Sequence, residues 1–301
     1  MQPEDKIQEI AERAERLQEI GSSILRVARD ELYLGMRFLD VALSSFSYQM
    51  DGQVHGFGTD GRVMYFQPQM LGGLYRENRI LVNRGYLHMV FHCIFRHFAW
   101  SGTEGKKRVD DGITIQERMR DLSCDIAVEH MIDGMNYRSI RFSRSLLRRE
   151  TYRLLEKEGK TLNAQRVYKI LSEWNLNEKD LTNLEQEFRT DDHRYWPKEE
   201  KLSAAAGAAQ KKWNKVARQM TLEQKRRGEE KEEGEQLLAA QVQAGKSRRS
   251  YRDFLQKFSV LREEITCDPD EFDLNYYTYG LHIYKNMPLI EPLESREVKK
   301  I

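Results

Sequence analysis

The stretch Leu87–His97 reads LHMVFHCIFRH, and the other predictions are built on it. His88 and His92 stand four residues apart in an apolar run without glycine or proline, which predicts a helix with both imidazoles on one face. Two histidines at this spacing can present two nitrogen atoms to one zinc ion. Because the apolar neighbours predict burial, unpaired imidazoles there would be costly. The stretch therefore predicts a metal-binding helix over residues 80–99.

A second predicted helix, Ile115–Met131, carries the carboxylates that a metal site needs. Asp121, Asp125 and Glu129 recur every four residues and so share one face. Asp125 is the preferred third ligand, because two histidines and one carboxylate are a common zinc set. Asp121 or Glu129 would then orient a histidine N–H from the second shell of the site. The alternative is a solvated acidic stripe that pairs with neighbouring arginines.

His97 is the alternative third ligand, in the spacing H-x3-H-x4-H. On a straight helix His97 lies about 140° round from His92, which is the wrong face. It could bind the same ion only if the chain bends after His92, and no glycine or proline stands there. Asp125 is therefore preferred over His97.

The residue after the first histidine raises a question about catalysis. Zinc peptidases of the H-E-x-x-H type use that glutamate to activate the metal-bound water, and here the position is Met89. Glu129 is a weak candidate for a substitute base. Zinc suits two nitrogens and one oxygen, although nickel, cobalt or iron(II) would also fit.

Composition limits the class of protein. The 49 basic residues nearly balance the 48 acidic ones, which gives no reason to expect nucleic acid or an acidic membrane as partner. No apolar run reaches membrane-spanning length, and no signal peptide is recognisable. Three widely spaced cysteines do not form a disulfide framework, so a cytoplasmic location is expected.

The hydrophobic periodicity and the turn residues of the sequence predict the remaining helices and strands. Helices are predicted over 5–30 and 31–43, followed by a small antiparallel sheet from SFSYQM and RVMYFQP and a short helix over 69–78. An edge strand of this sheet could hold an extended peptide segment. Further helices are predicted at 144–158 and 163–174.

The C-terminal half is helical and polar in its pattern. We expect a domain 1–140 that holds the metal and a helical extension 141–301 that packs on it, with long charged helices over 199–245, an amphipathic helix over 251–264 and an aromatic tail 272–294. In the segment DDHRYW, His193 could be a further ligand, but a turn capped by Asp192 with Trp196 packed on it is preferred.

The order TDGRVMYFQPQML, H-x-x-x-H-x-x-x-x-H and CDIAVEH resembles the N-terminal metallopeptidase-like, or zincin-like, domain of bacterial proteins that also carry a von Willebrand factor A domain. His88, His92 and His97 match the three family histidines, and Asp125 matches the family aspartate. Met89 departs from the family glutamate, and Glu129 stands where the family has asparagine.

The resemblance continues through LNAQRVYKIL, DDHRYW, YRDFLQKF and YYTYGLHIYKNMPLIEPLE, and so covers most of the chain. It implies an α+β, mostly α fold with a zincin-like domain. It also implies a von Willebrand factor A domain and a MoxR-type AAA+ ATPase as partners. The chain stops about where the A domain would begin, and we expect either a portion of a longer protein or a gene that lost its tail.

Three functions are compatible with these patterns. The preferred one is a zincin-like pseudoenzyme, a metal-binding domain without its general base that serves in assembly or regulation. The second is an active zinc-dependent hydrolase with a substitute base, since metal polarisation alone can leave residual activity. The third is a metal-free helical scaffold whose histidines belong to the core.

Overall fold

The structure is a computed structural model, and it describes most of the chain. The described residues are 3–100, 115–158, 161–196, 204–226, 236, 238–239, 242, 261–285, 290 and 292–300. They fall into two compact units, Met1–Lys246 and Ser247–Ile301, which are described separately. The expected boundary at residue 140 lies inside the first unit. Within the described residues, no helix has the length and apolar character needed to cross a bilayer.

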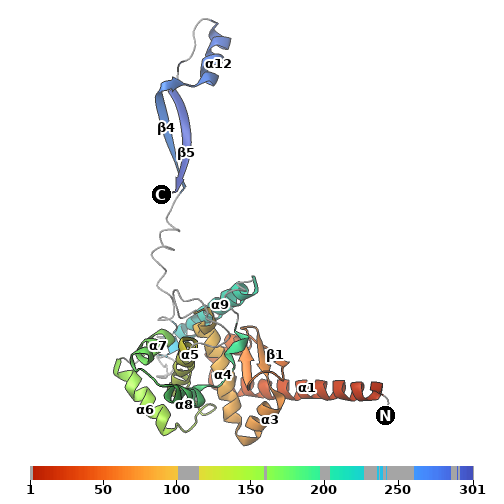
Figure 1. Cartoon of the computed structure of the whole chain (residues 1–301). Coiled ribbons are helices and arrows are strands. Elements are labelled where there is room, and N and C mark those ends of the chain that lie inside the picture. Colours follow the sequence, from red (N-terminus) through yellow and green to blue (C-terminus); the bar gives the residue numbers. More distant parts are fainter. Residues whose placement is uncertain are drawn as a thin grey trace. The chain divides into compact units, whose positions relative to one another are not determined.

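The first unit is mostly helical with one small sheet, as the sequence predicts at the level of an α+β, mostly α fold (Figure 1). Its elements, in chain order, are α1 Pro3–Gly35, η1 Arg37–Leu39, α2 Asp40–Leu43, β1 Ser47–Met50, β2 Phe57–Thr59, β3 Val63–Phe66, α3 Pro68–Glu77, α4 Arg79–Phe95, η2 His97–Ala99, α5 Ile115–Gly134, α6 Leu146–Leu155, η3 Glu156–Glu158, α7 Ala164–Glu173, α8 Glu178–Phe188, η4 His193–Tyr195 and α9 Ala204–Arg226.

Helices α4 and α5 lie side by side at the centre of this unit (Figure 1). The consecutive residues 82–94 of α4 and 122–132 of α5 are all buried, so neither helix has a solvent face over that length. A helix buried all round belongs to the middle of a fold. Every polar side chain on these stretches therefore needs a partner inside the protein.

The local sequence explains where α4 begins and ends. The side chain of Asn78 accepts a hydrogen bond from the backbone N–H of Ile80 at 2.9 Å and caps the first turn. The helix stops at Phe95, earlier than the predicted 99, because Arg96 adopts a left-handed conformation with φ 62°. The chain thus bends before His97 without glycine or proline, contrary to the sequence-based expectation.

The sheet is mixed, which corrects the predicted antiparallel arrangement. Its strand order is β1-β3-β2, with β2 antiparallel and β1 parallel to β3. Asp60 accepts hydrogen bonds from the backbone N–H groups of Arg62 and Val63, which forms the tight β2–β3 turn. Because β2 occupies one edge of β3, β1 pairs with the opposite edge of β3.

Two helical glycines allow aromatic rings of the sheet to approach. A Cβ atom on Gly21 of α1 would lie 2.1 Å from the Phe66 ring, and one on Gly85 of α4 would lie 2.5 Å from the Phe57 ring. Gly21 therefore does not interrupt α1, which runs unbroken from residue 3 to residue 35 and replaces the two predicted helices there. In Figure 1 the N-terminal half of α1 extends away from the rest of the unit.

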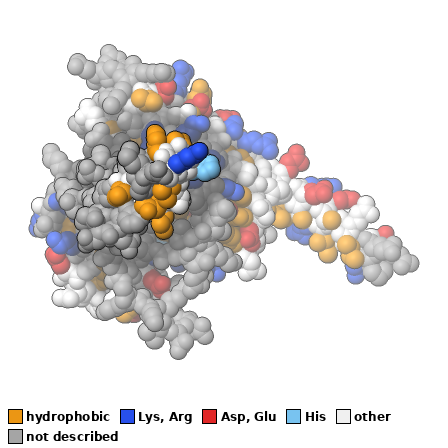
Figure 2. Space-filling model, turned by 90° about the horizontal axis from the view of Figure 1, so that it is seen from above, with side chains coloured by type: hydrophobic (Ala, Val, Ile, Leu, Met, Phe, Trp, Pro, Cys, Tyr) orange, Lys and Arg blue, Asp and Glu red, His pale blue; other side chains and the backbone are white. Residues whose placement is uncertain are grey.

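The second unit contains a two-stranded antiparallel sheet, β4 Leu261–Phe272 and β5 Pro292–Lys300, and the helix α12 Leu274–Tyr284. The predicted helix 251–264 is wrong for its last four residues, since pairing with β5 makes them strand. Its first ten residues lie outside the described residues, as does much of 199–245 apart from α9. Exposed hydrophobic side chains gather on α12 (Figure 2), among them Tyr276, Tyr279, Ile283 and Tyr284. The packing of the aromatic tail on the first unit stays a prediction.

We expect the Gly85→Ala substitution to destabilise the protein by about 1–3 kcal/mol, because its Cβ would overlap the buried Phe57 ring. The matched control is Gly72→Ala in α3, where nothing lies within 4 Å of the added atom. That variant should be stabilised by up to about 1 kcal/mol through helix propensity. Urea unfolding measures both free energies, and equal stability of the two variants would contradict the packing described here.

Candidate metal centre

Four side chains from three segments converge between α4 and α5. His88 and His92 come from α4, Asp125 comes from α5, and Asp191 follows α8. All four are buried, and each offers one ligand atom within 4.8 Å of the others. The structure thus brings the three preferred sequence candidates together and adds Asp191. This buried cluster can hold a metal ion.

The distances between these candidate ligand atoms are similar to the ligand-to-ligand distances around one bound metal ion. Nε2 of His88 lies 2.8 Å from Nε2 of His92, and Oδ1 of Asp125 lies 3.5 and 3.3 Å from these two nitrogens. Oδ1 of Asp191 lies 3.3 and 3.8 Å from them. Ligands at zinc distances around a tetrahedral centre are about 3.3–3.4 Å apart. The cluster therefore has the size of a single ion's shell.

The outer nitrogens of both histidines are held by neighbouring side chains. Nδ1 of His88 donates to Oε1 of Glu129 at 2.7 Å, so its Nε2 turns a lone pair toward the cluster. Nδ1 of His92 lies 3.0 Å from Nδ1 of His97, which can accept its proton. With both Nδ1 atoms protonated, two lone pairs face each other across 2.8 Å. That arrangement is repulsive unless a proton, shared as a hydrogen bond, or a metal cation lies between them.

His97 is buried beside the cluster but faces the wrong nitrogen of His92 to share its ion. The bend at Arg96 turns its ring back onto α4, which explains its place. Burial, followed by the neighbouring His92, holds the pKa of His97 well below its ordinary value. A neutral His97 suits an acceptor of the His92 proton better than a ligand of the same ion.

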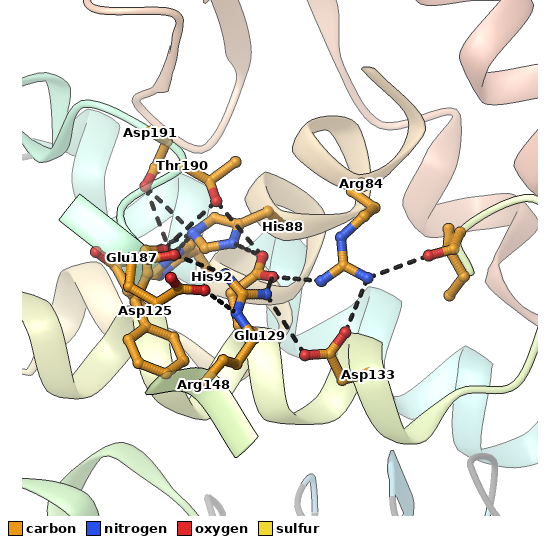
Figure 3. A network of polar contacts seen from close by, with 12 residues as sticks. Arg84, His88, His92, Asp125, Glu129, Asp133, Arg148, Glu187, Thr190 and Asp191 are labelled. Atoms are coloured by element: carbon orange, nitrogen blue, oxygen red, sulfur yellow. Dashed lines mark hydrogen bonds and ion pairs between the residues drawn. The ribbon is translucent and has the colours of Figure 1, made fainter. Parts of the chain in front are cut away.

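Glu129 lies in an ionic network that fixes His88 (Figure 3). Its Oε2 accepts from Arg84 and, at 2.7 Å, from Arg148, while Oε1 takes the His88 proton. Burial alone would raise the pKa of Glu129, but Arg84 and the bond to His88 lower it below the usual range. Because both oxygens are engaged, Glu129 is placed to orient His88 rather than to accept a proton from water.

Asp133 is the second carboxylate that pairs with the two arginines of this network. It pairs with Nη1 of Arg84 at 2.9 Å and with Arg148 at 3.4 Å. Two guanidinium groups therefore face the two carboxylates of Glu129 and Asp133. Asp125 and Asp191 have no arginine among their described partners and are faced by the imidazoles of His88, His92 and His193. A divalent cation bound there would take the place of protons on these imidazoles as the positive charge that faces the two carboxylates.

The carboxylates of the cluster show the same shortage of partners. Among the described residues, Oδ1 of Asp125 and both oxygens of Asp191 are buried without a hydrogen bond. Burial would raise the pKa of each, but the adjacent histidines, His193 above all, hold both pKa values below the ordinary range. Ionised, buried oxygens without donors are the chemistry of metal ligands.

The remaining predicted residues lie close by. Asp121 pairs with Arg120 and has Oδ2 3.7 Å from Nδ1 of His193, so it lies beside that histidine rather than His88 or His92. Met89 is fully buried and belongs to the main apolar cluster. Cys93 and Cys124 are buried and free.

Asp191 is the ligand candidate that sequence reasoning missed. The backbone N–H of Asp192 donates to the carbonyl oxygen of Phe57 at 2.7 Å, and a parallel bridge joins Phe57 to Asp191. This contact with the edge of β2 carries Asp191 into the cluster. The DDH sequence at 191–193 is the local signal that could have identified Asp191 as a ligand.

No protein-family model matches the chain, and neither a curated protein nor a solved structure shows significant similarity to it. The chemistry of the site therefore rests on its geometry.

We expect Arg84→Met to cost about 3–5 kcal/mol in the free energy of unfolding, because it leaves Glu129 and Asp133 buried without their partner. Arg79→Met is the matched control on the same helix, since Arg79 pairs with Glu31 but its side chain is 66% exposed. That variant should lose less than about 1 kcal/mol. Chemical unfolding of both variants tests the difference, and similar losses would refute the buried network.

Proposed function

We propose that this chain is a zincin-like metal-binding protein without hydrolytic activity, which holds one divalent cation through His88, His92, Asp125 and Asp191. The observation that carries the proposal is the buried convergence of two imidazole nitrogens with two carboxylates, of which Oδ1 of Asp125 and both oxygens of Asp191 have no hydrogen-bond partner among the described residues. Zinc is the preferred ion, because imidazole and carboxylate ligands suit it. The same set also accepts other first-row divalent ions.

Three features favour a structural or regulatory ion over a catalytic one. A catalytic zinc commonly has three protein ligands and keeps one position open for water, whereas at least four protein donors converge here. The side chains of His88, His92 and Asp191 are 0% exposed. Met89 contributes an apolar side chain to the core where a peptidase has its base. Glu129, the substitute candidate, has no free oxygen among its described contacts.

The resemblance to the metallopeptidase-like domains that accompany von Willebrand factor A domains remains part of this proposal. In its support, a small sheet, the histidine helix and the carboxylate helix follow one another in the expected order. We accordingly propose an assembly or regulatory role in the cytoplasm, with such an A domain and a MoxR-type AAA+ ATPase as partners. A bound peptide is less favoured at β2, because the chain's own residues 191–192 pair with Phe57 there.

We expect the purified protein to contain about one equivalent of a divalent metal, with zinc predominating. Chelation should lower the melting temperature by about 5–10 °C, the shift for an ion at a hundredfold excess over its dissociation constant. Elemental analysis and thermal unfolding with and without chelator measure these quantities.

Asp125→Asn should lose the metal, while His130→Gln should keep it. His130 is a buried histidine of the same helix, but it pairs with Glu156 outside the cluster. A metal-free protein that is unaffected by added zinc would overturn the proposal and favour the metal-free scaffold.

We expect no metal-dependent peptidase activity from the native chain on casein or unfolded peptide substrates. Met89→Glu should not create activity, because position 89 is in the apolar core and Asp191 fills a ligand position. This variant should instead lose stability through burial of an unpaired charge. Chelator-sensitive hydrolysis by the native protein would overturn the proposed inactivity and support a hydrolase with another base.

A further inference from the structure

We infer that His193 is a fifth ligand of the ion, so that the centre is a three-histidine, two-aspartate site of coordination number five rather than a tetrahedral one. This inference rests on the proposed function and extends it to the coordination of the ion. It assigns the role to a residue from the turn η4, which the sequence pattern favoured as a structural turn.

The first observation is the position of the ring. Nε2 of His193 lies 2.9 Å from Oδ1 of Asp125 and 3.0 Å from Oδ1 of Asp191, the same two oxygens that face His88 and His92. Two ligands about 2.1 Å from an ion and at right angles to each other are about 3.0 Å apart. Such right angles occur in five-coordinate and six-coordinate shells but not in a tetrahedral one.

The second observation concerns hydrogen bonding. The side chain of His193 is only 10% exposed, and its Nε2 is buried with no hydrogen-bond partner among the described residues. The oxygens at 2.9 and 3.0 Å also have none, so the contacts lack hydrogen-bond geometry. A ring that merely donated to these carboxylates would point its N–H at one of them. Close polar atoms that do not bond to each other are typical of ligands around a common ion.

The third observation is the side chain next to the outer nitrogen of the His193 imidazole. Oδ2 of Asp121 lies 3.7 Å from Nδ1 of His193, on the side where Glu129 is hydrogen-bonded to Nδ1 of His88 and His97 to Nδ1 of His92. All three imidazoles thus have a neighbour at the outer nitrogen and turn Nε2 inward. This is the usual arrangement of metal-binding histidines, whose second N–H is held by a neighbouring acceptor.

The turn also fixes the ring before any ion binds. Asp192 caps η4 by accepting from the backbone N–H of Arg194 at 3.2 Å, and Trp196 stacks on the His193 ring at 3.8 Å with an interplanar angle of 26°. The predicted capping turn and the ligand role are therefore compatible. The cap and the stacked indole hold the imidazole in place for coordination.

Five donors with three imidazoles suit first-row divalent ions that accept coordination numbers above four. Zinc can also expand to five ligands. We therefore expect the centre to bind Co²⁺ with the weak visible absorption of a five-coordinate complex rather than the intense bands of a tetrahedral one.

The test is X-ray absorption spectroscopy of the full chain loaded with Zn²⁺, which counts the imidazoles bound to the ion. We expect three in the native protein, two in His193→Gln and three in the control His130→Gln. In the Co²⁺-loaded protein, His193→Gln should intensify the visible bands, and free imidazole added to His193→Gly should restore the native spectrum. A structural role for His193 would not produce this rescue.

Two imidazoles in the native, metal-loaded protein would overturn the inference while leaving the proposed function intact. The same holds for a Co²⁺ spectrum that does not change in His193→Gln. If the native protein bound no metal, the proposed function itself would fail. The native count does not depend on the folding of any variant.

Discussion

The burial of Asp125 and Asp191 against histidines, without an arginine partner, is the constraint on which the site depends. Burying unpaired charge costs several kcal/mol per ion even after relaxation. Arg84 and Arg148 offset Glu129 and Asp133, but Asp125 and Asp191 have only imidazoles near them. The apolar residues that surround both helices exclude the water that could otherwise solvate these two carboxylates. A divalent ion bound between the imidazoles would offset both carboxylates without protonated histidines.

The ionic network and the sheet have separate tasks around the cluster. The network of Arg84, Glu129 and Arg148 orients His88 and joins α4, α5 and α6 (Figure 3). The sheet holds the turn after α8, because its edge at Phe57 pairs with Asp191 and accepts from Asp192. In this protein the edge of β2 thus positions a ligand of the chain itself, and this contact makes the candidate shell more complete than the motif on α4 suggests.

Local pattern was sufficient for the central helices and for three ligand candidates. The i, i+4 spacing of His88 and His92 and the carboxylate face of α5 depend only on helix geometry. The sequence pattern did not predict the features that depend on contacts between segments far apart in the chain. Asp191 reaches the cluster through pairing with β2, β1 pairs parallel to β3 although β2 lies between them in the sequence, and 261–264 become strand by pairing with β5. The bend before His97 depends on a left-handed Arg96, which its residue type does not announce.

The placement of the ligands on α4, α5 and the turn after α8 has a consequence for how the protein reaches its native state. None of these segments can complete the shell alone, so an ion bound there would act as a reversible cross-link that closes two long loops of the chain. Closing loops of this kind costs entropy that grows only slowly with their length. The ion is therefore expected to be captured late, after α4 and α5 have docked, and its loss would loosen the turn at residues 191–193 before it loosens the helical core.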